Sequence, residues 1–131
     1  MSNNAISIHG FADNAVINIK NCHFEEVSNC VRISNRTNAK NITINIEDCT
    51  CDKWDPREYA GFILFQEYPS GQLGFENITL NIKNLVGPNG KITGTPESIC
   101  GTKDANQVIY VYSNNAVQSY NSNIYPKINI N

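Results

Sequence analysis

The stretch ITINIEDC, residues 42–49, decides the fold of this chain because copies of it recur along the sequence. AVINIKNC at 15–22 and ITLNIKNL at 78–85 align with it without gaps, and Ile-Asn-Ile returns at 128–130. Counted along Ile17, Ile44, Leu80 and Ile128, the spacings are 27, 36 and 48 residues. Unequal spacing around a constant strand predicts a solenoid, in which insertions lengthen the loops on one side.

Apolar and polar residues alternate within each copy, and side chains of a strand point alternately to its two faces. The pattern predicts two inward rows, Ile17-Ile44-Leu80 and Ile19-Ile46-Ile82. Outward columns follow, with asparagine at 18, 45 and 81 and alternating charges at Lys20, Glu47 and Lys83. Opposite charges on neighbouring strands stabilise a sheet modestly, so the charged column favours this stacking.

A third inward row, at Cys22, Cys49 and Leu85, lies an odd number of residues beyond the second. The alternation must therefore break in between. The break is occupied by Asn21, Asp48 and Asn84, residue types that tolerate left-handed backbone and bond to their own turn. We interpret them as a stacked ladder of turns, which assigns Asp48 a structural role.

A second class of strand lies between the copies, with members at 5–10, 30–35, 61–66 and 107–114. Each coil thus offers at least two strands, joined in later coils by long loops at 51–59 and 86–106. The alternative is an antiparallel sandwich, but Asn89-Gly90 is the one hairpin dipeptide in the sequence. Within the second loop, Thr95-Pro96-Glu97-Ser98 predicts a single helical turn.

Composition predicts one domain, residues 1–131, that buries a core. A net charge of −2 with 17% charged residues disfavours nucleic-acid and membrane partners. No signal-peptide pattern opens the chain, so we expect a soluble protein made in a cytoplasm. The 21 asparagines fit a chain rich in turns. The five cysteines form no Cys-x-x-Cys pair, so free and mostly buried thiols are expected.

One loop gathers residues suited to sugar chemistry. Acids serve proton transfer and aromatic rings stack on sugars; the loop offers Asp52, Asp55 and Glu58 beside Trp54 and Tyr59. A single loop shows no catalytic partner, however, so a solvated polar loop explains it as well. A metal site could be imagined from Cys22, His23, Cys49 and Cys51, but the sequence pattern does not direct four ligands to one point. We therefore predict no metal, no cofactor and no catalytic residues.

The segments NAVINIKNCHFEEVSNCVRISN (14–35) and NITINIEDC (41–49) resemble the pectin-lyase-like right-handed parallel β-helices. The resemblance implies an all-β fold, a short right-handed parallel β-helix of about three to four irregular coils. The calcium-binding acids and the catalytic Arg or paired Asp of that family's enzymes map onto no residue here. The stretches at 61–75 and 99–112 resemble small β-helical proteins of Firmicutes-type bacteria and their phages, which implies a virion or prophage component.

Two functions follow as hypotheses. The first is a non-enzymatic structural module, such as a phage decoration, cement or tail-associated protein, located in the virion or otherwise in the bacterial cytoplasm. Its partners would be copies of itself or virion proteins, which would cover an uncapped final strand at Ile128 and Ile130. The second is a carbohydrate-binding or polysaccharide-degrading β-helix, with contacts at Trp54, Tyr59, Tyr68, Asp52, Asp55 and Tyr112. A fragment of a longer β-helix is a third possibility.

Overall fold

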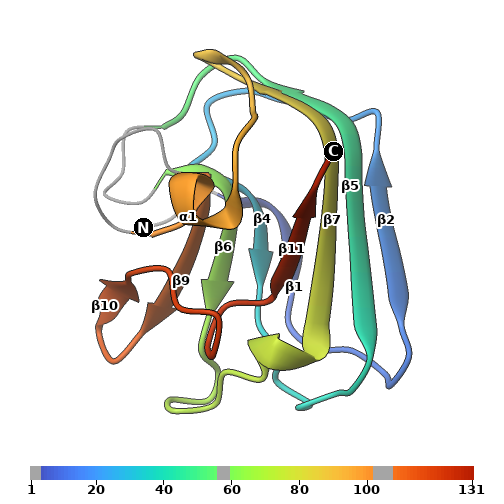
Figure 1. Cartoon of the computed structure of the whole chain (residues 1–131), viewed down its shortest axis with the longest axis vertical. Helices are drawn as coiled ribbons and strands as arrows, with labels where there is room; N and C mark the ends of the chain where they lie inside the picture. Colours follow the sequence, from blue (N-terminus) through green and yellow to red (C-terminus); the bar gives the residue numbers. More distant parts are fainter. Residues whose placement is uncertain (1–3, 56–59, 102–107) are drawn as a thin grey trace.

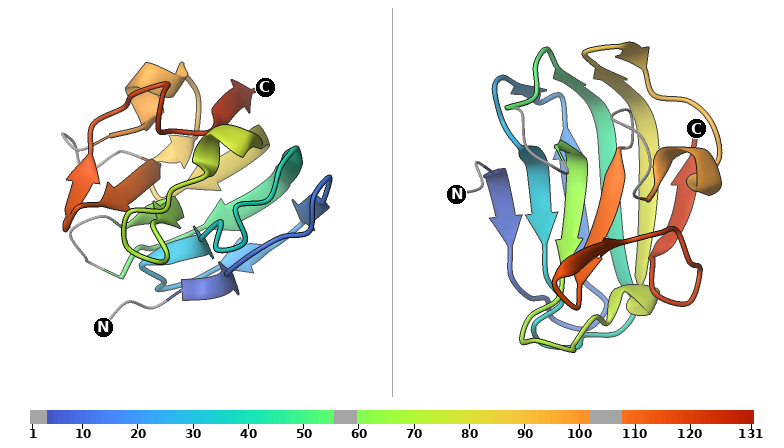
Figure 2. Two further views of the ribbon diagram at one scale, coloured as in Figure 1. Left: turned by 90° about the horizontal axis from the view of Figure 1, so that it is seen from below. Right: turned by 90° about the vertical axis from the view of Figure 1, so that its left-hand side faces the viewer.

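Two facing β-sheets dominate the computed structural model, which describes residues 4–55, 60–101 and 108–131 (Figure 1). Strands account for 51% of the structure and helices for 6%, which confirms the predicted predominance of β-structure. Seen along the strands, the sheets face each other across a shared interior (Figure 2). The chain passes repeatedly from one sheet to the other.

The first sheet has the order β1-β4-β6-β9-β10. Its strands are β1 (Asn4–Ile8), β4 (Asn29–Ile33), β6 (Gly61–Gln66), β9 (Ile109–Ser113) and β10 (Ala116–Gln118). The first four pair in parallel, and β10 returns antiparallel to β9. These four are the predicted second class of strand, and the right-hand view of Figure 2 shows them side by side.

The second sheet has the order β11-β7-β5-β2, all in parallel pairing. Its strands are β2 (Val16–Lys20), β5 (Ile42–Cys51), β7 (Ile78–Gly87) and β11 (Lys127–Ile130). Two short strands extend it: β3 (His23–Phe24) pairs in parallel with β5, and β8 (Gly90–Lys91) pairs antiparallel with β7. Parallel pairing throughout the central strands contradicts the antiparallel sandwich.

Helical structure is limited to two short segments in the described part of the chain, the 3-10 turn η1 (Phe75–Asn77) and the helix α1 (Pro96–Ile99). Thr95 is the N-cap of α1 and Pro96 is its first residue, which confirms the predicted helical turn. No helix among the described residues is long and apolar enough to span a membrane.

The register of the repeated strands is the predicted one. Ile17 pairs with Ile44, Ile44 with Leu80 and Leu80 with Ile128, and the row through Ile19 follows the same steps. Ile44 and Leu80 are fully buried. Burying an aliphatic side chain of this size contributes about 1.5–3 kcal/mol, so each added strand extends one continuous core.

Asparagines form a continuous ladder on the outer face of the second sheet. The side-chain amide of Asn45 donates to Asn18 Oδ1 (2.9 Å), Asn81 donates to Asn45 (2.9 Å), and Asn129 donates to Asn81 (2.8 Å). Beside the ladder, Lys20 forms an ion pair with Glu47 (3.6 Å), as the alternating charges predicted.

The break in alternation is a column of left-handed residues. Asn21, Asp48 and Asn84 have φ values of 58°, 53° and 51°, and Asn84 Nδ2 donates to Asp48 Oδ1 (2.8 Å). Each left-handed residue turns the next side chain back inward, so Cys49 and Leu85 are fully buried. The predicted turn ladder, with Asp48 in a structural role, is confirmed.

The first sheet supplies the opposite wall of the core. Its inward rows are Ile6-Val31-Ile63-Ile109 and Ile8-Ile33-Phe65-Val111. Buried Asn35 joins the connection between β4 and β5 to the connection between β6 and β7. Its amide nitrogen donates to Ala39 O and Gly74 O, and its oxygen accepts from Ala39 N. Three bonds satisfy this buried side chain, as burial of a polar group requires.

All five cysteines are free thiols, as predicted; Cys22 is half-buried and the others are buried. Burial raises the pKa of the Cys100 thiol to about 12 and raises the pKa of the Cys30, Cys49 and Cys51 thiols as well. The thiolate is the reactive form of cysteine. These four thiols therefore react slowly with thiol reagents, because they are buried and because they stay protonated at neutral pH.

The asparagine ladder predicts a graded loss of stability. Asn45→Ala removes two ladder bonds and should lower the free energy of unfolding by about 1–2 kcal/mol, whereas Asn129→Ala removes one and should cost about half of that. Alanine and asparagine are both poor strand formers, so the comparison isolates the bonds. Urea unfolding measures both variants, and equal losses would show that the ladder does not stabilise the fold.

Thiol labelling tests the buried rows. A thiol reagent at neutral pH should modify one cysteine quickly in the folded protein and all five in denaturant. Cys22→Ser should abolish the fast phase and leave the other four thiols slow. Rapid modification of two or more thiols in the folded protein would contradict the described burial.

Candidate functional site

The residues predicted for a sugar site lie at two opposite ends of the sheets. Trp54 belongs to the connection that leaves the end of β5, whereas Tyr68 belongs to the connection from β6 into the start of β7. Because β5 and β7 are parallel and in register, these connections are separated by the length of the strands (Figure 1). The aromatic platform that combined Trp54 with Tyr68 is therefore wrong. Tyr59 and Glu58 lie outside the described residues.

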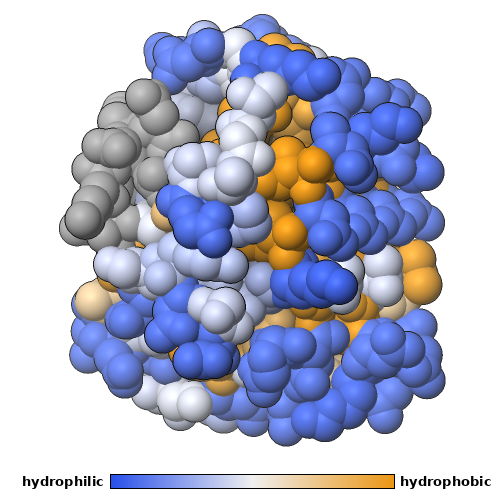
Figure 3. All heavy atoms as spheres, in the orientation of Figure 1, coloured by the Kyte–Doolittle hydropathy of each residue, from blue (hydrophilic) through white to orange (hydrophobic). Residues whose placement is uncertain are grey.

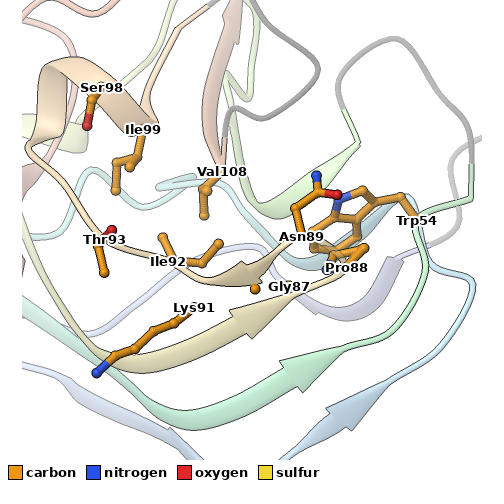
Figure 4. Close-up of a pocket in the computed structure, with 11 residues that line it drawn as sticks. Trp54, Gly87, Pro88, Asn89, Lys91, Ile92, Thr93, Ser98, Ile99 and Val108 are labelled. Atoms are coloured by element: carbon orange, nitrogen blue, oxygen red, sulfur yellow. The ribbon is translucent and has the colours of Figure 1, made fainter.

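Trp54 forms one wall of a pocket. Its ring packs edge-on against Phe62, with the ring centroids 5.3 Å apart and an interplanar angle of 85°, and its backbone bridges to Val27. The pocket has a volume of about 330 Å³. Figure 4 shows Trp54 with Pro88 and Asn89 at one end and Ser98 with Ile99 at the other.

The remaining wall of this pocket comes from the turn between β7 and β8 and the residues that follow it. Ile92 and Val108 provide apolar surface between the two ends, and Asn89, Thr93 and Ser98 provide polar groups (Figure 4). An aromatic ring with a few amides and hydroxyls is the kind of lining that small ligands use.

The predicted acids do not join Trp54. The Asp52 carboxylate lies 3.2 Å from His23 Nε2 and its side chain is 69% exposed. The backbone N–H of Asp55 donates to Val27 O (2.9 Å), beside the bridge between Trp54 and Val27. Neither Asp52 nor Asp55 lines the Trp54 pocket.

The structure brings together a different group, His23, Glu25 and Asp52. His23 Nε2 lies 3.2 Å from both Glu25 Oε1 and Asp52 Oδ2. The group does not include the cysteines near His23 in the sequence repeat, because Cys49 and Cys51 are buried in the core. The 27-residue repeat contained the missing signal, because it places Glu25 beside Asp52.

Strand β11 lies at the edge of the second sheet and pairs with β7. The prediction that little chain covers this end needs correction. Residues before the strand cover the core: Tyr125 is 1% exposed, its hydroxyl donates to Gln118 O (2.6 Å), and its ring packs against Tyr120 at 5.1 Å. Ile128 is consequently buried and Ile130 half-buried.

The outer backbone edge of β11 nevertheless has no strand beside it among the described residues. Figure 3 shows apolar side chains gathered between α1 and β11; Ile92 and Ile130 are half-buried residues that pack against the core. An edge strand next to apolar surface is a feature typical of interfaces.

Tyr68 belongs neither to the Trp54 pocket nor to the edge of β11. It is 43% exposed, and the Arg36 guanidinium lies 4.8 Å from the centre of its ring. A stacked Arg of this kind stabilises an exposed ring by about 0.5–1 kcal/mol, which accounts for the position of Tyr68 without a ligand.

Comparison with known proteins adds no relative. No protein-family model matches the chain, and neither a curated protein nor a solved structure matches it.

Proposed function

We propose that this chain is a short right-handed parallel β-helix of about three to four irregular coils that serves as a non-enzymatic structural or assembly module. The parallel, in-register stacking in both sheets supports this fold, as does the repeated passage of the chain between the two sheets. Crossovers between parallel strands are right-handed in almost all proteins.

The observation that carries the proposed function is the edge of β11. Asn131 N donates to Ile82 O (2.9 Å), so the pairing with β7 uses the odd-numbered amides of this strand. Alternate residues of a parallel strand bond to opposite sides, and the amide of Ile130 therefore points away from β7. An edge of this kind is a template for another strand.

Within this class, we propose a component of a bacteriophage virion, such as a capsid decoration, cement or tail-associated protein. The support is the resemblance of the 61–75 and 99–112 segments to small phage-associated β-helical proteins. The partner would be another copy of the chain or another virion protein, held by backbone pairing along β11 and by apolar contact with half-buried Ile130; the predicted contact with Ile128 is not available, because Ile128 is buried in the core.

If the edge of β11 binds another copy of the chain, a charged side chain on this strand should weaken self-association. Ile130→Lys should weaken self-association at least tenfold, because an edge lysine opposes strand addition, and analytical ultracentrifugation measures the effect. Tyr68→Lys is the control, since Tyr68 is 43% exposed in the connection between β6 and β7 and lies on neither edge of this sheet, and it should leave association unchanged.

Hydrogen exchange completes this test. The backbone amide of residue 130 should exchange slowly in the associated parent protein and quickly in the Ile130→Lys variant. A parent protein that remains monomeric while its Ile130 amide exchanges quickly would contradict the proposed use of this edge.

A second candidate function, glycan binding, rests on the Trp54 pocket. Sugar rings stack on aromatic faces and bond to amides and hydroxyls, and this pocket offers Trp54 together with Asn89 and Thr93. Its separation from Tyr68 by the length of the strands limits it to a small ligand or the end of a chain. Glycan binding would occur beside, and not instead of, the structural role.

Tryptophan fluorescence tests this pocket directly, because Trp54 is the single tryptophan of the chain. A glycan selected on an array should change its emission, and Asn89→Ala should weaken the binding at least tenfold by removing a polar contact. Tyr68→Ala is the control at the other end of the sheets and should bind as the parent does. Equal affinity of the parent and the Asn89→Ala variant, or no bound glycan, would contradict this function.

A further inference from the structure

Two neighbouring strands present a group of polar side chains on the outer face of the second sheet. His23 pairs with Thr50 across β3 and β5. Two residues further, Asp52 N donates to Phe24 O (3.3 Å), which continues the same parallel pattern and places Asp52 beside Glu25. The strand pairing thus directs the imidazole and the two carboxylates to one spot.

The distances at this spot match the coordination of a metal ion. Zinc binds nitrogen and oxygen ligands at about 2.0–2.2 Å in a tetrahedron, in which neighbouring ligand atoms stand about 3.3 Å apart. His23 Nε2 is 3.2 Å from each carboxylate oxygen, and the three ligand atoms all lie within 4.8 Å of one another. Both carboxylates are at the surface, so small rotations of the Glu25 and Asp52 side chains can bring their oxygens to the spacing of zinc ligands.

A fourth residue orients the imidazole. Thr50 Oγ1 contacts His23 Nδ1, on the side of the ring opposite the carboxylates. Without a metal, Nε2 is placed to donate its proton to the carboxylates. A hydroxyl can accept as well as donate, so when a metal replaces the Nε2 proton, Thr50 Oγ1 can accept from Nδ1–H and leave the Nε2 lone pair to the metal. Histidine ligands of metals are usually held in this way through their second nitrogen.

We propose that His23, Glu25 and Asp52 bind a divalent transition-metal ion, with Zn²⁺ as the ion that suits this ligand set. The imidazole selects Zn²⁺ and its neighbours over Ca²⁺ and Mg²⁺, which prefer oxygen ligands alone. Three protein ligands leave one position of the tetrahedron open to water or to a group from a partner. This site shares only His23 with the combination of Cys22, His23, Cys49 and Cys51, for which the sequence predicted no metal binding.

The surrounding charges favour a cation. Next to the site, Lys53 forms an ion pair with Glu26 (3.6 Å), so this neighbouring cation is balanced by its own acid. Glu25 and Asp52 therefore add two negative charges beside one imidazole. The proposal is independent of the function of β11, because β3 and β5 lie away from that edge.

A zinc titration followed by NMR tests the site in the full chain. At neutral pH the ring signals of His23 should shift with added Zn²⁺, while those of His9, the other histidine and an exposed one, should not. His23→Gln and Asp52→Asn should each weaken zinc binding at least tenfold. Thr50→Val retains the β-branched shape that suits a strand and should weaken binding about tenfold through the lost orientation of the ring.

Control variants distinguish this site from other zinc ligands. Glu26→Gln changes an acid of the adjacent ion pair and Cys22→Ser removes the half-buried thiol next to His23; both should bind zinc as the parent does. Backbone spectra of each variant establish that it is folded. The proposal is overturned if the His23 signals do not respond to Zn²⁺, if Cys22→Ser abolishes binding, or if Ca²⁺ competes equally with Zn²⁺.

Discussion

In-register stacking of equivalent strands is the constraint on which the rest of this structure depends. Strands in a sheet lie about 4.8 Å apart, so each side chain has its counterpart from the next strand as its nearest neighbour. A slip of one residue would turn every isoleucine of a strand to solvent. The rows through Ile44 and Ile46, the asparagine ladder and the left-handed column at Asp48 all follow from this one register.

The same constraint explains which parts of the fold the sequence predicts. Repeated positions meet repeated neighbours, so the strand register, the break at Asp48 and the second sheet could be derived from spacing and alternation alone. The helical turn after Thr95 was predictable for a local reason, because its cap and Pro96 lie within one turn.

Features without a repeat were not predictable in this way. The cover formed by Tyr120 and Tyr125 occurs once, and nothing in the sequence ties these residues to the end of the core. The separation of Trp54 from Tyr68 follows from which end of a strand each connection leaves, whereas composition treats the two aromatics alike. In the group at His23, the 27-residue spacing places Glu25 beside Asp52, but His23 reaches Asp52 by a diagonal contact between strands, which that spacing does not indicate.

A column that breaks the repeat therefore carries information that a regular column does not. Asn18, Asn45, Asn81 and Asn129 are identical because each stabilises its neighbour. The outward column through His23 instead reads His23, Thr50 and Val86, so no ladder of equal side chains explains it. Stacking places no demand on these residues to be a histidine with two acids beside it. Ion pairs of a protonated imidazole with both carboxylates hold these side chains at 3.2 Å, and the proposed metal site uses the same convergence of unlike side chains at one point.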